Sequence, residues 1–428
     1  MLFSTENPYR KGLPEVLHLD RSDFQFGISA LNLDAVDQQA SWSVFTFMAA
    51  DDPALSAAMF DDLLEMKSVG SNKDLHVCAM FFGPLLTDTF FARLNASTPF
   101  PEDIIFRFLH ADSNPTILIE SIRNNSVIFP SEKKMLILSG HGNGWKGLLP
   151  NLQTWKRYLK KGIALPYGKI EPNLQQLEAC YWQTLEAIRA RFRPEDDYRG
   201  SPFDLVAFDA CKMANIEALA LFADNVPCIV ASEAPEPGTG YPYDRILGKL
   251  ADHPGMDSGE MAKHIVASVT DFYESADDPG LSKMLTQSVF NGTHLPGLCE
   301  RIGALSRALC SSMNEKACQI VNECMHNTYS FGGGFLDLIG LALNLESAWI
   351  SREVTLKARS LTDYYEHSGV VVYKQVAGGK ELPNGLSIYA PDPYEFSPDY
   401  LHLLPSLPGD FLYWKQFLEM YHTWSVRR

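Results

Sequence analysis

The sequence predicts an α/β fold, with a mostly parallel sheet flanked by helices and a largely helical subdomain after it. Two observations predict this class. Short apolar runs alternate with helical patterns through residues 42–232, and such alternation is typical of βαβ units. Two of these runs, 135–138 and 205–208, are continuously apolar, as strands buried on both faces are. We therefore expect a sheet that is covered by helices on both faces.

The expected elements come in a clear order along the chain. Strands are expected at 42–50 and 75–82, and helices at 53–68 and 115–126. The next strands end at His141 and at Cys211, with a helix from Ala214 and a strand at 227–232 after them. From about 258 the pattern is mostly helical. It is interrupted by three glycines at 332–334, and a hairpin is expected at 369–391, before an aromatic terminal helix.

These patterns predict three parts: a lead-in at 1–36, the α/β domain at 37–275, and a mostly helical subdomain with the hairpin at 276–428. Within the α/β domain, the segment 148–203 is longer than a parallel crossover needs. We therefore expect it to be an inserted linker.

Composition excludes some classes of function. The chain has 36 Lys and Arg against 52 Asp and Glu, a net charge of -16, so the basic face of a nucleic-acid-binding protein is not expected. No apolar run approaches the length of a membrane span, so a membrane partner is not expected either. The first ten residues lack the basic and apolar regions of an export signal, which predicts a cytosolic protein.

His141 and Cys211 are the candidate reacting residues. Each follows a strand of the predicted sheet, and functional groups of open α/β sheets lie beyond the carboxyl ends of the strands. Two such strands side by side would bring the imidazole to the thiol, where it lowers the thiol pKa and acts as a base. The backbone amides of Gly142 and Cys211 are the candidate oxyanion donors, because Gly142 has no side chain to obstruct a carbonyl oxygen.

Several separated motifs occur together in one order. They are LSGHGNG at 138–144, FDACKMA at 208–214, ASE at 231–233 and PGTGYPY at 237–243. In this the chain resembles the clostripain family of cysteine peptidases, within the caspase-like clan. The resemblance implies a caspase-like sheet, a Cys-His dyad and hydrolysis of peptide bonds after Arg or Lys. It requires no cofactor; calcium activation, known in the family, is possible, and we assign no metal ligands.

The resemblance also implies where the substrate binds. Asp209 would lie at the base of the S1 pocket and select a basic side chain through charge-assisted pairing. Ser232 and Glu233, with Tyr241 in the turn-rich loop after them, would form the other wall. Tyr241 stands where the family more often has tryptophan.

An unregulated peptidase of this specificity would be destructive in a cytosol, so we expect a zymogen or an activating partner. The inserted segment carries basic residues at which such an enzyme could cut itself: Lys156, Arg157, Lys160, Lys161 and Lys169. The alternative at this segment is a solvated basic face. The alternative for the whole chain is a catalytically silent caspase-like adaptor that binds basic peptides.

Overall fold

The computed structural model describes residues 18–19, 39–50, 55–83, 89–108, 121–122, 125, 128–147, 203–223, 226–275, 285–377, 383–397, 400 and 409–426. Contacts within the chain group it into two compact units. The first comprises Met1–Gly140, Leu149–Ile163 and Gly238–Asp257, and the second comprises His141–Leu148, Ala164–Pro237 and Ser258–Arg428. The domain boundaries predicted from the sequence stay a prediction.

The first unit contains a mixed sheet with strand order β1-β5-β4-β3-β2-β6. Its strands are β1 (His18–Leu19), β2 (Ala40–Met48), β3 (Leu75–Phe82), β4 (Thr89–Arg93), β5 (Ile104–Phe108) and β6 (Ser131–Ser139). β2 is parallel to both β3 and β6, whereas β4 is antiparallel to its neighbours. All eight residues of β3 are buried, including His76, its one polar side chain.

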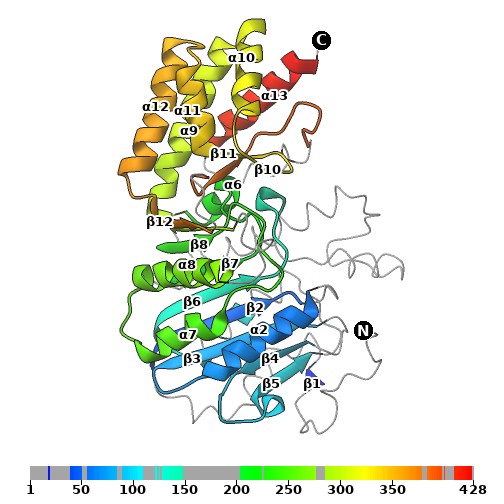
Figure 1. Cartoon of the computed structure of the whole chain (residues 1–428), viewed down its shortest axis with the longest axis vertical. Helices are drawn as coiled ribbons and strands as arrows, with labels where there is room; N and C mark the ends of the chain where they lie inside the picture. Colours follow the sequence, from blue (N-terminus) through cyan, green and yellow to red (C-terminus); the bar gives the residue numbers. More distant parts are fainter. Residues whose placement is uncertain are drawn as a thin grey trace, which may run out of the picture. The chain divides into compact units, whose positions relative to one another are not determined.

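Helices α2 (Ser56–Val69) and α7 (Tyr243–Asp252) run side by side along this sheet (Figure 1). The backbone N–H of Tyr243 donates to a carboxylate oxygen of Glu65 over 2.9 Å, which joins the start of α7 to α2. The strands expected at 42–50 and 75–82 and the helix at 53–68 are thus confirmed. The helix expected at 115–126 lies largely outside the described residues.

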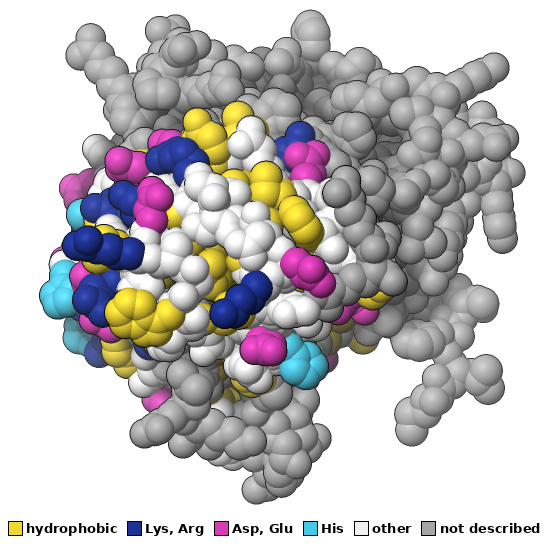
Figure 2. Space-filling view, turned by 90° about the horizontal axis from the view of Figure 1, so that it is seen from above, with side chains coloured by type: hydrophobic (Ala, Val, Ile, Leu, Met, Phe, Trp, Pro, Cys, Tyr) yellow, Lys and Arg dark blue, Asp and Glu magenta, His cyan; other side chains and the backbone are white. Residues whose placement is uncertain are grey.

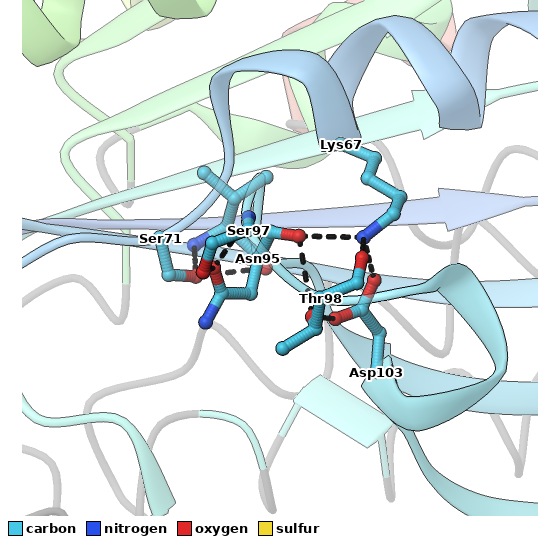
Figure 3. Close-up of polar contacts among 7 residues, drawn as sticks. Lys67, Ser71, Asn95, Ser97, Thr98 and Asp103 are labelled. Atoms are coloured by element: carbon cyan, nitrogen blue, oxygen red, sulfur yellow. Dashed lines mark hydrogen bonds and ion pairs between the residues drawn. The ribbon is translucent and has the colours of Figure 1, made fainter.

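A buried ion pair joins the last turn of α2 to the segment between β4 and β5 (Figure 3). The Lys67 ammonium donates to the carbonyl oxygens of Asn95 at 2.5 Å and Thr98 at 2.6 Å, and to Asp103 Oδ2 at 2.5 Å. The Thr98 hydroxyl donates to the other Asp103 oxygen over 2.6 Å. The Asp103 side chain is 1% exposed, so groups of the chain rather than water compensate its charge.

The second unit begins with strands β7 (Leu205–Asp209) and β8 (Cys228–Ala231), which are parallel. β9 (Thr286–Asn291) and β12 (Val371–Val376) extend this arrangement in antiparallel fashion. Between β7 and β8 lie the short helix α6 (Ile216–Leu219) and the 3₁₀ turn η5 (Ala220–Phe222). Helix α8 (Ser258–Glu274) packs on β8, β9 and β12.

Helices dominate the rest of this unit. Figure 1 shows α9 (Leu295–Ser312), α10 (Glu315–His326), α11 (Leu338–Ser347), α12 (Arg352–His367) and α13 (Leu412–Val426) gathered in one group. Figure 2 looks onto this end of the chain and shows basic, acidic and single apolar side chains interspersed. Such mixing is typical of a solvated surface.

The hairpin expected at 369–391 does not form. β12 pairs with β9, whereas β13 (Ser387–Tyr389) pairs with β11 (Phe335–Asp337) in a second sheet of order β10-β11-β13. The three glycines make the turn between β10 (Ser330–Gly332) and β11, with φ of 75°, 69° and 83° at Gly332, Gly333 and Gly334. These left-handed conformations explain why glycine occupies all three positions.

Candidate active site

Cys211 lies two residues beyond the end of β7, in a sharp turn. All five residues of β7 are buried, whereas Cys211 is partly exposed. Lys212, the next residue, has φ of 61°, a left-handed conformation that is uncommon for a side chain other than glycine. The turn is held because the Lys212 N–H donates to the Ala234 carbonyl over 3.0 Å and the Ala214 N–H donates to the Ser232 carbonyl over 2.8 Å. The strand thus ends by presenting a thiol.

The loop of residues 141–147, called here the His141 loop, lies directly against this turn. A Cβ placed on Gly142 would come within 2.5 Å of the Cys211 carbonyl oxygen and 3.1 Å of the Cys211 nitrogen. Real Cβ atoms do not approach backbone so closely, so only glycine fits here. The structure therefore brings the segment of His141 to the backbone of Cys211, within one unit of the chain. His141 itself is partly exposed.

Aromatic packing anchors the far end of the His141 loop. Trp145 is 1% exposed, and its ring centroid lies 4.8 Å from that of Tyr389 and 5.0 Å from that of Tyr400. A Cβ on Gly144 would lie 2.7 Å from the ring of Phe335, so glycine is needed there as well. The loop is therefore fixed at both ends.

Glu217 joins these aromatic residues to α6. Its carboxylate accepts hydrogen bonds from the Tyr389 N–H at 3.0 Å, the Tyr400 hydroxyl at 2.9 Å and the Asn215 amide at 2.6 Å. Burial raises the pKa of Glu217 from 4.5 to about 7, although these hydrogen bonds oppose the rise. Glu217 thus supports the residues on which the His141 loop rests.

The Cys211 sulfur has polar neighbours from the segment after β8. The Glu236 N–H donates to it over 3.3 Å, and the thiol lies 3.7 Å from the Glu236 carbonyl oxygen as a donor. Glu236 was not predicted from the sequence. The sequence does carry a signal for Glu236, because this acid stands between two prolines, Pro235 and Pro237, which restrict the local backbone.

Charged side chains surround the thiol. Asp209 is 6% exposed, and burial together with the charges of Asp209 and Cys211 raises the pKa of Glu236 well above its usual range. The Lys212 ammonium donates to the Gly332 carbonyl over 3.3 Å. Burial lowers the pKa of Lys212 and Lys146 adds to this effect, whereas Cys211 opposes it.

The residues predicted to form the second wall of the S1 pocket are buried. Ser232 and Glu233 are both 0% exposed. The Ser232 hydroxyl donates to the Ala234 carbonyl over 3.0 Å, and Glu233 Oε1 accepts from the Gly385 N–H over 2.8 Å. Both side chains thus have internal partners, and their contact with substrate stays a prediction. Tyr241 is 1% exposed. It belongs to the first unit, whereas Cys211 belongs to the second.

The basic residues of the inserted segment, Lys156, Arg157, Lys160, Lys161 and Lys169, lie outside the described residues. Among the residues that are described, no group of three or more His, Cys, Asp or Glu side chains could hold a metal ion. In the same part of the chain, no helix has both the length and the apolar character needed to cross a membrane. Calcium activation stays a prediction.

Three solved structures share this fold. Two are a secreted C11 cysteine protease from Bacteroides thetaiotaomicron, one of them in complex with an irreversible peptide inhibitor. The inhibitor complex has a TM-score of 0.55 at 15% identity, covering 90% of this chain and 99% of that one. The other has a TM-score of 0.60 at 13% identity, covering 88% and 99%. An inactive zymogen C11 protease from Parabacteroides distasonis has a TM-score of 0.55 at 18% identity, covering 90% and 97%.

These comparisons correct the expected location. Two of the matching structures are described as secreted proteins, so the cytosolic assignment is wrong. It depended only on the missing export signal, and that absence does not decide the compartment.

The family is shown by the sequence itself. The model of the clostripain family matches residues 46–419, which include the His141 loop, the Cys211 turn and all of the helical group except the end of α13. No curated protein matches the chain. With its caspase-like sheet and partly exposed thiol, the chain belongs to the clostripain family and is a C11 cysteine peptidase.

Proposed function

We propose that this peptidase cleaves peptide bonds after arginine or lysine, with Cys211 as nucleophile, His141 as base and then acid, and Asp209 as the anchor for the basic side chain. The observation that carries this proposal is the close approach of Gly142 to Cys211, because the loop that carries His141 lies against the backbone of the proposed nucleophile. Asp209 adds a buried carboxylate two residues before the thiol.

The chemistry follows from these positions. The Cys211 sulfur attacks the carbonyl carbon as its proton passes to His141, and the carbonyl electron pair moves onto the oxygen. The amides of Gly142 and Cys211 would donate to this oxyanion. When the C–N bond breaks, His141 protonates the leaving amine and a thioester remains. Water then attacks the thioester, which releases the acid and restores the thiol.

Peptide cleavage tests the specificity. We expect Asp209→Asn to reduce the preference for Arg over a neutral side chain by about 1.5–3 kcal/mol, the value of a hydrogen bond to a charged group. Glu353→Gln, a neutralisation at an exposed site of α12, should leave the preference unchanged. Cleavage after aspartate in a peptide library would refute the proposed anchor.

We further propose that the enzyme is made as a zymogen that cuts its inserted segment at one of the basic residues between 155 and 170. In support, one structure of similar fold is described as an inactive zymogen. Wild-type protein should give two fragments by mass spectrometry, whereas Cys211→Ala should remain one chain. A wild-type protein that stays intact and is fully active would exclude cleavage as the activating step. Activation by a partner or by calcium would then be the alternative to test.

The adaptor alternative predicts binding of basic peptides without turnover. The family assignment and the partly exposed thiol favour the enzyme. Turnover of an arginine peptide by the wild-type protein separates the two.

A further inference from the structure

The carboxyl group of Glu236 is held beside the nucleophile by contacts that leave one oxygen unused. Gln287 Nε2 donates to Oε1, and the Ala210 N–H donates to the same carboxyl group. Oε2 is fully enclosed and has no hydrogen-bond partner among the described residues. The backbone of Glu236 cannot easily move away, because its N–H donates to the Cys211 sulfur at 3.3 Å.

The charged groups that act most on Glu236 are both acidic. They are Asp209, at the end of β7, and the Cys211 thiol. Burial and these two neighbours raise the pKa of Glu236, so its carboxyl group keeps a proton at a pH where an exposed glutamate would be ionised. The buried Glu236 carboxyl group thus has one oxygen without a hydrogen-bond partner among the described residues and interacts electrostatically with a second buried acid, Asp209. A bound cation would stabilise both carboxylates.

We propose that Glu236 is a second determinant of substrate selection, which pairs with Asp209 to bind the cationic side chain and loses its proton to solvent when that side chain arrives. This inference rests on the proposed preference for Arg and Lys. It adds that Glu236 contributes to this preference and that the preference depends on pH. An Arg guanidinium has five N–H donors, enough to reach both carboxylates.

With Glu236 in the substrate site, the preference for arginine depends on pH, which a Cys-His dyad alone would not cause. As the pH rises, Glu236 ionises before substrate binds, and the site becomes more attractive to a cation. The ratio of kcat/KM for an arginine peptide to kcat/KM for its citrulline counterpart should therefore rise with pH. Citrulline has nearly the shape of arginine without its charge. Effects on the attack at the peptide bond are shared by both peptides and cancel in the ratio.

The first experiment measures this ratio from pH 5.5 to 8.5 in the wild type, Glu236→Gln and Glu353→Gln. In Glu236→Gln, we expect the ratio to fall roughly ten- to a hundredfold at high pH and to lose its pH dependence. Glu353→Gln should behave as the wild type. An unchanged ratio in Glu236→Gln, beside a reduced ratio in Asp209→Asn, would overturn this inference and leave the proposed function intact. A wild type that cleaves both peptides equally would overturn both.

A second measurement does not depend on the folding of Glu236→Gln. Calorimetric titration of Cys211→Ala with the arginine peptide, in phosphate and in Tris at pH 7, gives the number of protons released on binding. We expect more protons to be released on binding of the arginine peptide than on binding of the citrulline peptide. Binding of the arginine peptide without proton release would overturn the inference.

Discussion

The backbone N–H of Glu236 donates a hydrogen bond to the sulfur of Cys211 over 3.3 Å. This contact joins the segment after β8 to Cys211, the proposed nucleophile, two residues beyond the end of β7, and the Glu236 carboxyl group interacts electrostatically with Asp209. A single short segment thus contacts the sulfur of the proposed nucleophile and carries an acid of the proposed substrate site.

The approach of Gly142 to Cys211 predicts that Gly142→Ala is nearly inactive. The added Cβ would lie 2.5 Å from the Cys211 carbonyl oxygen, so the His141 loop or the nucleophile turn must shift. Displacement of reacting groups by about 1 Å can cost about a hundredfold in rate, and we expect kcat/KM to fall by at least that factor. Gly248→Ala is the control, because nothing lies within 4 Å of a Cβ at that position of α7. Full activity of Gly142→Ala would contradict the close approach.

The buried carboxyl group of Glu217 predicts a pH-dependent stability. Its pKa rises from 4.5 to about 7 in the folded chain, so between these values the folded state holds the proton more tightly than the unfolded state. The stabilising contribution is therefore complete below pH 4.5 and is lost as the pH rises through 7. Relative to the wild type, Glu217→Gln should gain up to about 3 kcal/mol in unfolding free energy between pH 5 and pH 8.

Urea denaturation at several pH values measures this difference. Glu353→Gln serves as the control, since its side chain is exposed. A constant difference between Glu217→Gln and the wild type across this range would show that Glu217 does not titrate as described.

The ion pair between Lys67 and Asp103 predicts a large loss of stability in Lys67→Met. Removal of the ammonium leaves the Asp103 carboxylate buried without its cation, which costs about 3–5 kcal/mol in comparable pairs. Lys73→Met removes a lysine that is 82% exposed and pairs with Asp74 at 3.4 Å, and it should cost less than about 1 kcal/mol. Equal melting temperatures for the two variants would argue against the buried pair.

The strands could be predicted from the sequence because their signals are local, and the same signals led to His141 and Cys211 as the candidate reacting residues. The buried strands β6 and β7 are continuous apolar runs, and a histidine or cysteine follows each directly. Gly142 could be singled out for its missing side chain. Its contact with Cys211 depends on the tertiary fold.

Other features depend on partners distant in the chain. β12 pairs with β9 and β13 with β11, and nothing in the segment 369–391 distinguishes these pairings from a hairpin. Glu236 reaches the thiol because the Lys212 N–H binds the Ala234 carbonyl and draws the two segments together. Periodicity does not report such contacts between loops.

Covalent labelling of the thiol tests the central claim most directly. A chloromethyl ketone with an arginine side chain, added to the wild-type protein and followed by digestion and mass spectrometry, should modify Cys211 alone among the eight cysteines. His141→Ala should react at least about a thousandfold more slowly, because the base that activates the thiol is missing. The citrulline analogue should also react much more slowly with the wild type. Modification of a different cysteine, or equal rates for the arginine and citrulline reagents, would contradict this account.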